Sequence, residues 1–226
     1  MSAAPELEPF ALTAEAEAYR YIHAAIRTGV YPPGFRLIPE DIAASIGTSR
    51  MPVREAFRRL ASEGLVTIRP NRGAMVTGLS LDEMQEVFEM RAALEGMAVR
   101  LAAPHMTPAN LAVMERMLND MDGHLDNLSD WAHAHQNLHA YLCGLSQRPR
   151  LTRHIAALHT LIEPYMRLWI KALDRPFGAR EHHIELLNAL RSRDPDIAEA
   201  AMRHHVQATV PELMQFLASR AQTASS

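Results

Sequence analysis

The histidines of this chain are concentrated in its second half. Eleven of the twelve lie beyond residue 100, in a pattern that includes one pair four residues apart and two adjacent pairs. Residues four apart lie on the same face of a helix, so His135 and His139 are spaced to bind one metal ion between them. Imidazole nitrogen suits zinc, nickel and copper. The spacing therefore predicts a site for a divalent metal.

The adjacent pairs, at 182–183 and 204–205, each offer one further ligand. Neighbouring residues lie about 100° apart around a helix, so only one member of each pair points squarely toward a helical core. In both pairs the second histidine continues an apolar stripe, so we expect His183 and His205 to be ligands. A swap to His182 or His204 remains open, as does a structural role for any single histidine.

Two other side chains are candidates for binding a small molecule beside the metal. Arg91 interrupts an apolar stripe where leucine would be expected, and a buried arginine needs an anion. That anion is either a small carboxylate ligand or a glutamate of the protein itself. Trp169 also lies on an apolar stripe, and it either walls the same cavity or packs in the core.

A second group of residues suits a polyanion. The segment SRMPVREAFRRLASEGL, residues 49–65, places Arg50, Arg54 and Arg58 on one helical face and an apolar seam on another. The arginine fork bonds two acceptors at once, either phosphate oxygens or the O6 and N7 edge of guanine. The segment predicts a DNA-recognition helix, with a solvated charged face as the alternative.

Elements that could position this helix lie on both sides of it. Ser49 is placed to cap its start by accepting a backbone N–H, and Gly64 to end it in the left-handed conformation. Two helical patterns precede it and two short strand patterns joined by a polar turn follow it, at residues 13–28, 39–45, 65–68 and 74–77. This order predicts a winged helix-turn-helix.

Further arginines extend the predicted DNA-binding surface. Arg69 and Arg72, in the turn between the strands, are placed to reach phosphates or a minor groove, and we include Arg36, Ser49 and Gly73 in the same DNA-binding set. Residues 36–78 hold seven arginines against four acidic residues, whereas residues 79–226 carry a net charge of −4. A local basic surface on an acidic body indicates site-specific binding rather than a coating of nucleic acid.

The remainder of the chain predicts an all-helical bundle. We therefore expect a mainly α protein with two domains, a winged helix-turn-helix over 1–78 and a helical domain over 79–226. The helices are predicted at Leu81–Ala103, Pro108–Leu128, Asp130–Leu145, Arg150–Leu173, Arg180–Arg191 and Pro195–Ala218.

Composition narrows the cellular setting. No apolar run approaches the roughly 18 residues that span a bilayer, so we expect no membrane partner and a cytoplasmic location. The single cysteine, Cys143, excludes an internal disulfide, and its apolar surroundings predict a buried structural thiol.

The N-terminal part resembles a known family of bacterial transcription regulators. The motifs PPGFRL, EDIAASIGTSRMPVREAFRRLASEGLV and RPNRGAMV resemble the winged helix of the GntR superfamily. The resemblance implies that Arg50 and Arg54 contact operator DNA and that Gly73 is the wing-tip glycine. Glu40 departs from the pattern, because some FadR-type members carry a DNA-contacting arginine there.

The C-terminal part resembles the FCD effector domain of the FadR-type branch. The motifs are LHAYLCGLSQRPRL, EHHIELLNAL and AAMRHHV. The resemblance implies metal ligands at His139, His183 and His205, with His135 standing where an acidic or amide residue is usual. Four imidazoles without a carboxylate favour zinc, nickel or copper over manganese or magnesium.

These features together predict a homodimeric, ligand-responsive regulator that binds double-stranded operator DNA. We expect a repressor of genes for uptake or catabolism of a small organic acid or sugar acid, with the carboxylate held at the metal. The alternatives are a direct sensor of the metal ion and a metal-dependent hydrolase that uses a histidine-bound water.

Overall fold

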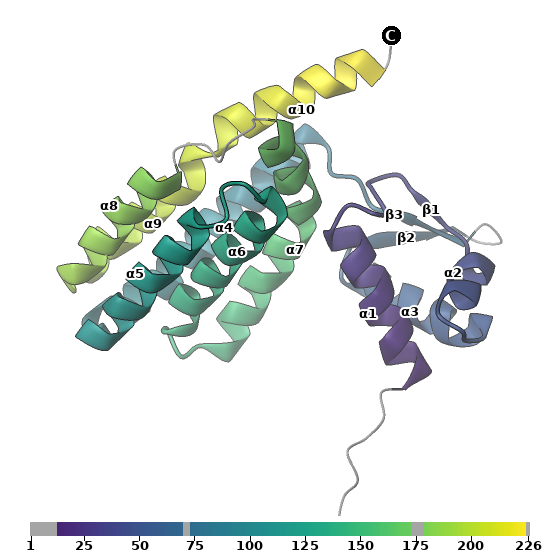
Figure 1. Ribbon diagram of the computed structural model, residues 1–226, viewed down its shortest axis with the longest axis horizontal. Coiled ribbons are helices and arrows are strands. Elements are labelled where there is room, and N and C mark those ends of the chain that lie inside the picture. Colours follow the sequence, from purple (N-terminus) through teal and green to yellow (C-terminus); the bar gives the residue numbers. More distant parts are fainter. Residues whose placement is uncertain (1–12, 70–72, 173–178, 225–226) are drawn as a thin grey trace, which may run out of the picture. The chain divides into compact units, whose positions relative to one another are not determined.

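The protein divides into two compact units at the Gly78–Leu79 bond (Figure 1). The computed structural model describes residues 13–69, 73–172 and 179–224 of the 226 in the chain. Arg72, predicted to bind DNA from the turn between the strands, lies outside the described residues. Among the described helices, none combines the length and apolarity that a membrane span requires.

The N-terminal unit is a winged helix-turn-helix, as predicted. It consists of α1 (Ala14–Arg27), β1 (Arg36–Leu37), α2 (Pro39–Ser45), α3 (Arg50–Ser62), β2 (Val66–Arg69) and β3 (Gly73–Val76). The sheet is antiparallel with the strand order β1-β3-β2. The sequence analysis missed β1, because two residues are too few to show the alternation that marks a strand.

Helix α3 has the two faces predicted for it. Its apolar seam is buried and α3 packs beside α1, while Arg50, Arg54 and Arg58 are exposed. Gly64 adopts a φ of 76°, the left-handed stop that was expected. The predicted cap is wrong in its detail: Ser49 occupies the N-cap position, but its side chain makes no capping hydrogen bond.

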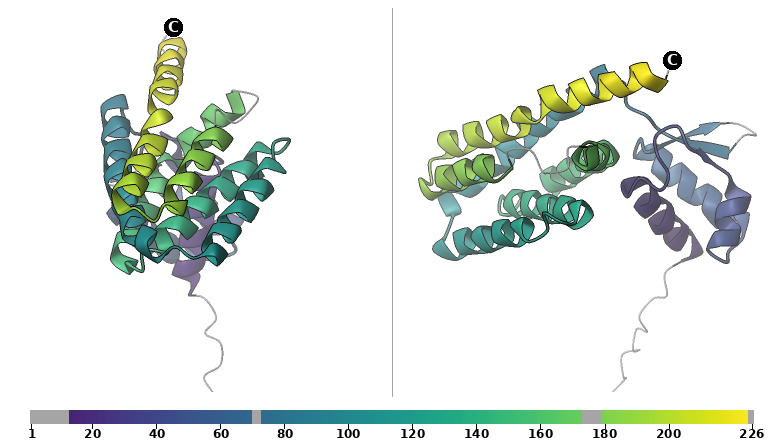
Figure 2. Two further views of the ribbon diagram at one scale, coloured as in Figure 1. Left: turned by 90° about the vertical axis from the view of Figure 1, so that its left-hand side faces the viewer. Right: turned by 45° about the horizontal axis from the view of Figure 1, so that its top comes forward.

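The second unit is a helical bundle, as predicted (Figure 2). Its elements are α4 (Leu81–Ala102), a 3-10 turn (Ala103–His105), α5 (Pro108–Asp122), α6 (Leu128–Gly144), α7 (Pro149–Ala172), α8 (Ala179–Arg191), α9 (Pro195–Ala208) and α10 (Val210–Ala224). Helix α4 begins with a capping box, in which Ser80 and Glu83 each accept a backbone N–H of the other.

Two predicted helix boundaries were wrong. The single helix expected over Pro195–Ala218 is two helices, because Pro211 lacks the N–H that would continue the hydrogen-bonding pattern of α9. The helix expected to run from Pro108 to Leu128 ends earlier, at Asp122. The next helix begins where the Asn127 side chain accepts the N–H groups of two following residues.

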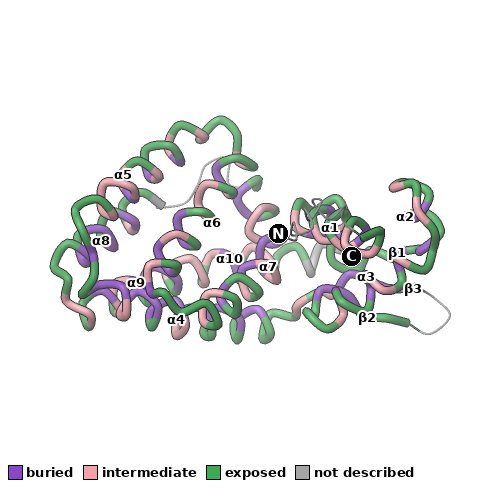
Figure 3. Tube along the Cα trace, turned by 90° about the horizontal axis from the view of Figure 1, so that it is seen from below, coloured by how far each residue is buried: buried purple, intermediate pink, exposed green. Residues whose placement is uncertain are grey.

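Helix α4 packs against α6, α7 and α9, while α8 packs against α9 and α5. Figure 3 shows buried positions recurring along α4, α6 and α9 with exposed positions between them. Cys143 is buried beside Ala98 and Ile155, as predicted, and burial raises the pKa of its thiol well above the ordinary value. The inward faces of these helices thus meet in one interior.

The close approach of β3 to β1 predicts a cost for any side chain at Gly73. Its φ is 80°, and an added Cβ would lie 2.5 Å from the carbonyl oxygen of Leu37. We expect Gly73→Ala to destabilise the winged unit by roughly 2–3 kcal/mol, measured by chemical denaturation with circular dichroism. Fluorescence of Trp131 and Trp169, both in the helical unit, should change little.

Gly29→Ala is the matched control, because Gly29 also has a positive φ, 78°, but an added Cβ would meet nothing within 4 Å. It should cost only about 1 kcal/mol of backbone strain. Equal destabilisation by the two substitutions would contradict the role given to the Leu37 carbonyl.

Candidate metal centre and DNA-binding surface

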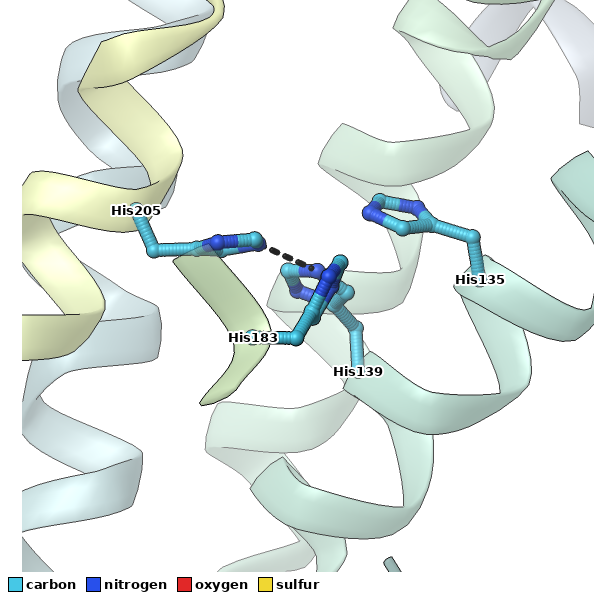
Figure 4. Close-up of side chains that lie close together, drawn as sticks. All are labelled: His135, His139, His183 and His205. Atoms are coloured by element: carbon cyan, nitrogen blue, oxygen red, sulfur yellow. Dashed lines mark hydrogen bonds between the residues drawn. The ribbon is translucent and has the colours of Figure 1, made fainter. Parts of the chain in front are cut away.

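Four histidine rings converge in the interior of the bundle. They are His135 and His139 on α6, His183 on α8 and His205 on α9, and the close-up shows them directed toward a common centre (Figure 4). One nitrogen from each ring lies within 4.8 Å of the others. The ring centroids of His183 and His205 are 4.3 Å apart, and those of His135 and His139 are 4.6 Å apart.

The two adjacent pairs divide between interior and surface. His183 and His205 are buried, with 2% and 7% of their surface exposed. Their neighbours are less enclosed: His182 is half-buried, with its ring centroid 6.4 Å from that of His205, and His204 is exposed. The structure therefore brings together the four histidines that the sequence analysis selected.

The spacing of the ring nitrogens suits a metal ion. Nε2 of His139 and Nε2 of His205 are 3.0 Å apart. Two nitrogens that bind one zinc at about 2.0–2.1 Å lie roughly 3.0–3.4 Å from each other. Nδ1 of His205 is also buried and meets no hydrogen-bond partner among the described residues. The separation of the two Nε2 atoms is thus the one that two ligands of a single ion require.

The electrostatics keep two of these rings in the form that binds metals. Burial, reinforced by the neighbouring imidazoles, holds the pKa values of His135 and His205 well below the ordinary value. Both rings are therefore neutral at neutral pH. Neutral imidazole has the free lone pair that coordinates a metal ion.

A buried carboxylate that the sequence analysis missed supports the cluster from behind. Glu95 on α4 has no exposed surface, and its Oε2 lies 2.7 Å from Nδ1 of His139. An ionised carboxylate can only accept, so the His139 N–H donates. That tautomer turns the lone pair of His139 Nε2 toward the other rings. A carboxylate behind a ligating histidine is a common means of orienting it.

Glu95 is also the partner of Arg91. Nε of Arg91 donates to Oε1 of Glu95 at 2.8 Å, and Nε2 of His159 on α7 lies 2.9 Å from the same oxygen. Burial raises the pKa of Glu95, but Arg91, His159 and His139 outweigh burial and hold it well below its usual value. Burial and Arg91 together lower the pKa of His159 to about 4.

These contacts separate two possible metal groups. Glu95, His139 and His159 also offer closely spaced ligand atoms, but the Arg91 guanidinium contacts both Glu95 and His159. That group already has a cation, so the four-histidine cluster is the stronger metal candidate. The internal glutamate considered as a partner for Arg91 is present. In the sequence, this pair is indicated by the spacing of four residues from Arg91 to Glu95, which places both side chains on one face of a helix.

A cavity of ≈ 40 Å³ adjoins the cluster. Arg91 and Trp169, the two candidate small-molecule contacts, line it together with Thr209 and the half-buried His182. A single water needs roughly 10–15 Å³ on this measure, so the space fits a few non-hydrogen atoms.

The predicted DNA-binding residues gather on the winged unit. Arg36, Arg54, Arg58, Arg69 and Gly73 line one hollow of ≈ 460 Å³. At its rim, Arg50 bonds Glu40, and Ser49 is exposed at the start of α3. Four guanidinium groups around one concave surface, on the face of a recognition helix, suit the phosphate backbone and base edges of DNA.

A winged helix-turn-helix with an arginine-lined face, joined to a helical unit that holds a histidine cluster, defines a DNA-binding transcription regulator. Models of protein families agree: the model described as bacterial regulatory proteins, gntR family, matches residues 14–76, and that of the FCD domain matches residues 86–208. The chain belongs to the GntR family of bacterial transcription regulators, in the branch that carries an FCD domain. The family consists of regulators and not of enzymes, which removes the hydrolase alternative.

Relatives align along most of the chain. The "Probable D-xylose utilization operon transcriptional repressor" of Paenarthrobacter nicotinovorans is 32% identical over 88% of this chain and 88% of its own length. The "Nta operon transcriptional regulator" of Aminobacter aminovorans is 29% identical over 83% of this chain and 88% of its own. Among solved structures, Escherichia coli McbR/YncC superimposes with a TM-score of 0.78 at 24% identity, covering 92% of this chain and all of that one, and so shares its fold.

The Glu95–His139 hydrogen bond predicts an effect on metal affinity. We expect Glu95→Gln to lower zinc affinity roughly 10–100-fold, measured by competition with a chelator, because the amide no longer fixes the His139 tautomer. Glu163→Gln is the control: Glu163 is also buried and paired with an arginine four residues away, Arg167, on α7. Wild-type affinity in a folded Glu95→Gln protein would show that this carboxylate does not orient the ligand.

Proposed function

We propose that this regulator is a homodimeric repressor whose helical unit binds a divalent metal, zinc or nickel, and a small carboxylate effector. The observation that carries the proposal is the convergence of His135, His139, His183 and His205 beside a cavity that Arg91 also lines. A divalent ion bound there would supply a positive centre for a carboxylate. We infer from these contacts that all four rings are ligands, and that the ion takes a fifth ligand position for the acid, as five-coordinate zinc or nickel allows.

The charges around the cavity support an anionic effector. Glu95 already balances Arg91, and imidazole rings supply no negative charge, so a bound ion would leave the centre positive. The small volume favours a compact organic acid over a larger sugar acid. The names of two relatives refer to operons, one of them for utilization of a sugar, which supports control of genes for small-molecule uptake or catabolism.

Dimerisation supports recognition of an operator with two half-sites. Two copies of α3 would read half-sites about one helical turn of DNA apart. Met90 and Met97 lie seven residues apart on α4, on one face, and 40% and 48% of their surfaces are exposed. They are candidate contacts between copies. The effector would favour one geometry of the dimer and so weaken simultaneous binding to both half-sites.

A direct metal sensor is the second candidate, and the number of histidines favours it. Four protein ligands complete a tetrahedral zinc site, whereas three leave a position for an exogenous ligand. His135 is the half-buried member of the cluster, and its ring centroid lies 6.2 Å from that of His205. Whether His135 binds the ion therefore decides between a site with four protein ligands and a site with three. Titration of zinc against operator binding without any acid separates the two candidates, because only a sensor responds to zinc alone.

The DNA-binding role predicts the effect of removing one arginine of the hollow. We expect Arg54→Ala to lower affinity for a duplex selected from a random library by about tenfold or more, and the salt dependence to weaken if the contact is to phosphate. Arg20→Ala is the control, since Arg20 is exposed on α1 and removes the same charge. Unchanged binding by Arg54→Ala would place the interface elsewhere.

The effector step predicts a metal-dependent change in stability. A panel of small organic acids should contain one that raises Tm only with zinc or nickel present, by roughly 5–10 °C at a hundredfold excess over Kd. His205→Ala should abolish the shift, and His204→Ala, which changes the exposed neighbour, should preserve it. A shift of the same size in metal-free protein would refute metal anchoring of the acid.

A further inference from the structure

One acidic side chain lines the hollow of the winged unit together with four arginines. Glu40, in the first turn of α2, shares this surface with Arg54 and Arg58 of α3. A carboxylate facing DNA repels the phosphate backbone, so it weakens binding that is independent of sequence. Glu40 should therefore have a second role in DNA binding that offsets this lost affinity.

The structure shows what Glu40 contacts. Nη1 of Arg50 donates to Oε1 of Glu40 at 3.0 Å, across the turn that separates α2 from α3. This hydrogen bond lowers the pKa of Glu40, so the carboxylate is charged at neutral pH. Half of the Glu40 side chain and two thirds of the Arg50 side chain are exposed, so both remain accessible to a duplex.

The bond restricts the Arg50 side chain. A free arginine has several rotatable bonds and can reach whichever phosphate lies nearest, whereas a guanidinium bonded at Nη1 populates fewer orientations. The tie leaves other N–H groups of the planar fork available, and two parallel N–H groups match the O6 and N7 acceptors of guanine.

We propose that Glu40 is a specificity-determining residue, which orients the Arg50 guanidinium toward a guanine edge and withholds it from phosphates. Glu40 thereby exchanges general affinity for discrimination between base pairs. It acts as a positioning residue through Arg50, in addition to the DNA contacts already expected of the arginines themselves.

The test measures base preference and general affinity separately. A random duplex library is bound to each of four proteins: wild type, Glu40→Gln, Glu40→Asp and Arg50→Ala. The frequency of each base is then counted at every position of the recovered sequences. Arg50→Ala identifies the base pairs that Arg50 reads. At those pairs Glu40→Gln should lose about tenfold or more of the discrimination, while its affinity for a duplex of unselected sequence should stay equal or rise.

Two variants distinguish the effect of orienting Arg50 from the effect of the negative charge of Glu40. Glu40→Asp keeps the charge but shortens the side chain, so it should lose the same discrimination without gaining general affinity. Asp41→Asn removes a charge from the neighbouring exposed residue of α2 and should keep the wild-type preferences. The proposal is overturned if Glu40→Gln, shown by circular dichroism to be folded, retains the preferences that Arg50→Ala loses. It is equally overturned if Asp41→Asn loses them to the same extent.

Discussion

The candidate metal centre depends on one buried carboxylate. Glu95 is fully enclosed, and an enclosed charge is tolerated only where it is paired and hydrogen-bonded. Its partners come from three helices: Arg91 on α4 itself, His139 on α6 and His159 on α7. The same contacts that neutralise Glu95 also fix which nitrogen of His139 faces the other three rings. Packing of the bundle and orientation of the candidate ligand His139 are therefore coupled, because the carboxylate cannot be satisfied unless the helices that carry these rings are packed.

In the winged unit, burial of one face of a helix likewise positions the residues on its opposite face. The buried seam of α3 fixes its rotation against α1, and that rotation alone decides where Arg50, Arg54 and Arg58 are presented. The sheet completes the surface: the pairing of β1 with β3 brings Arg36 into the same hollow as α3, and β2 adds Arg69. The contribution of Gly73 is to admit the Leu37 carbonyl at a distance that no side chain would allow.

Much of this arrangement was predictable from the sequence because it rests on local periodicity. The recognition helix, its arginine face, the wing and the inward histidine of each adjacent pair all follow from the period of a helix or strand. The role of Glu95 was not predictable from periodicity, since a glutamate in a helix is usually solvated. Only tertiary packing shows that this one is enclosed with His159. The strand β1 and the break before α10 were missed for related reasons: one is defined by its partner strand, and the other by a single proline within an otherwise continuous apolar pattern.

The order of these parts along the chain has a consequence during synthesis. All elements of the winged unit are contiguous and are made first, so this unit can fold while later helices are still being translated. The histidine cluster, in contrast, draws on helices from α6 to α9, and His205 is the last of its members to leave the ribosome. A nascent chain therefore completes its DNA-binding surface first, and the four candidate metal ligands can converge only after α9 has been translated.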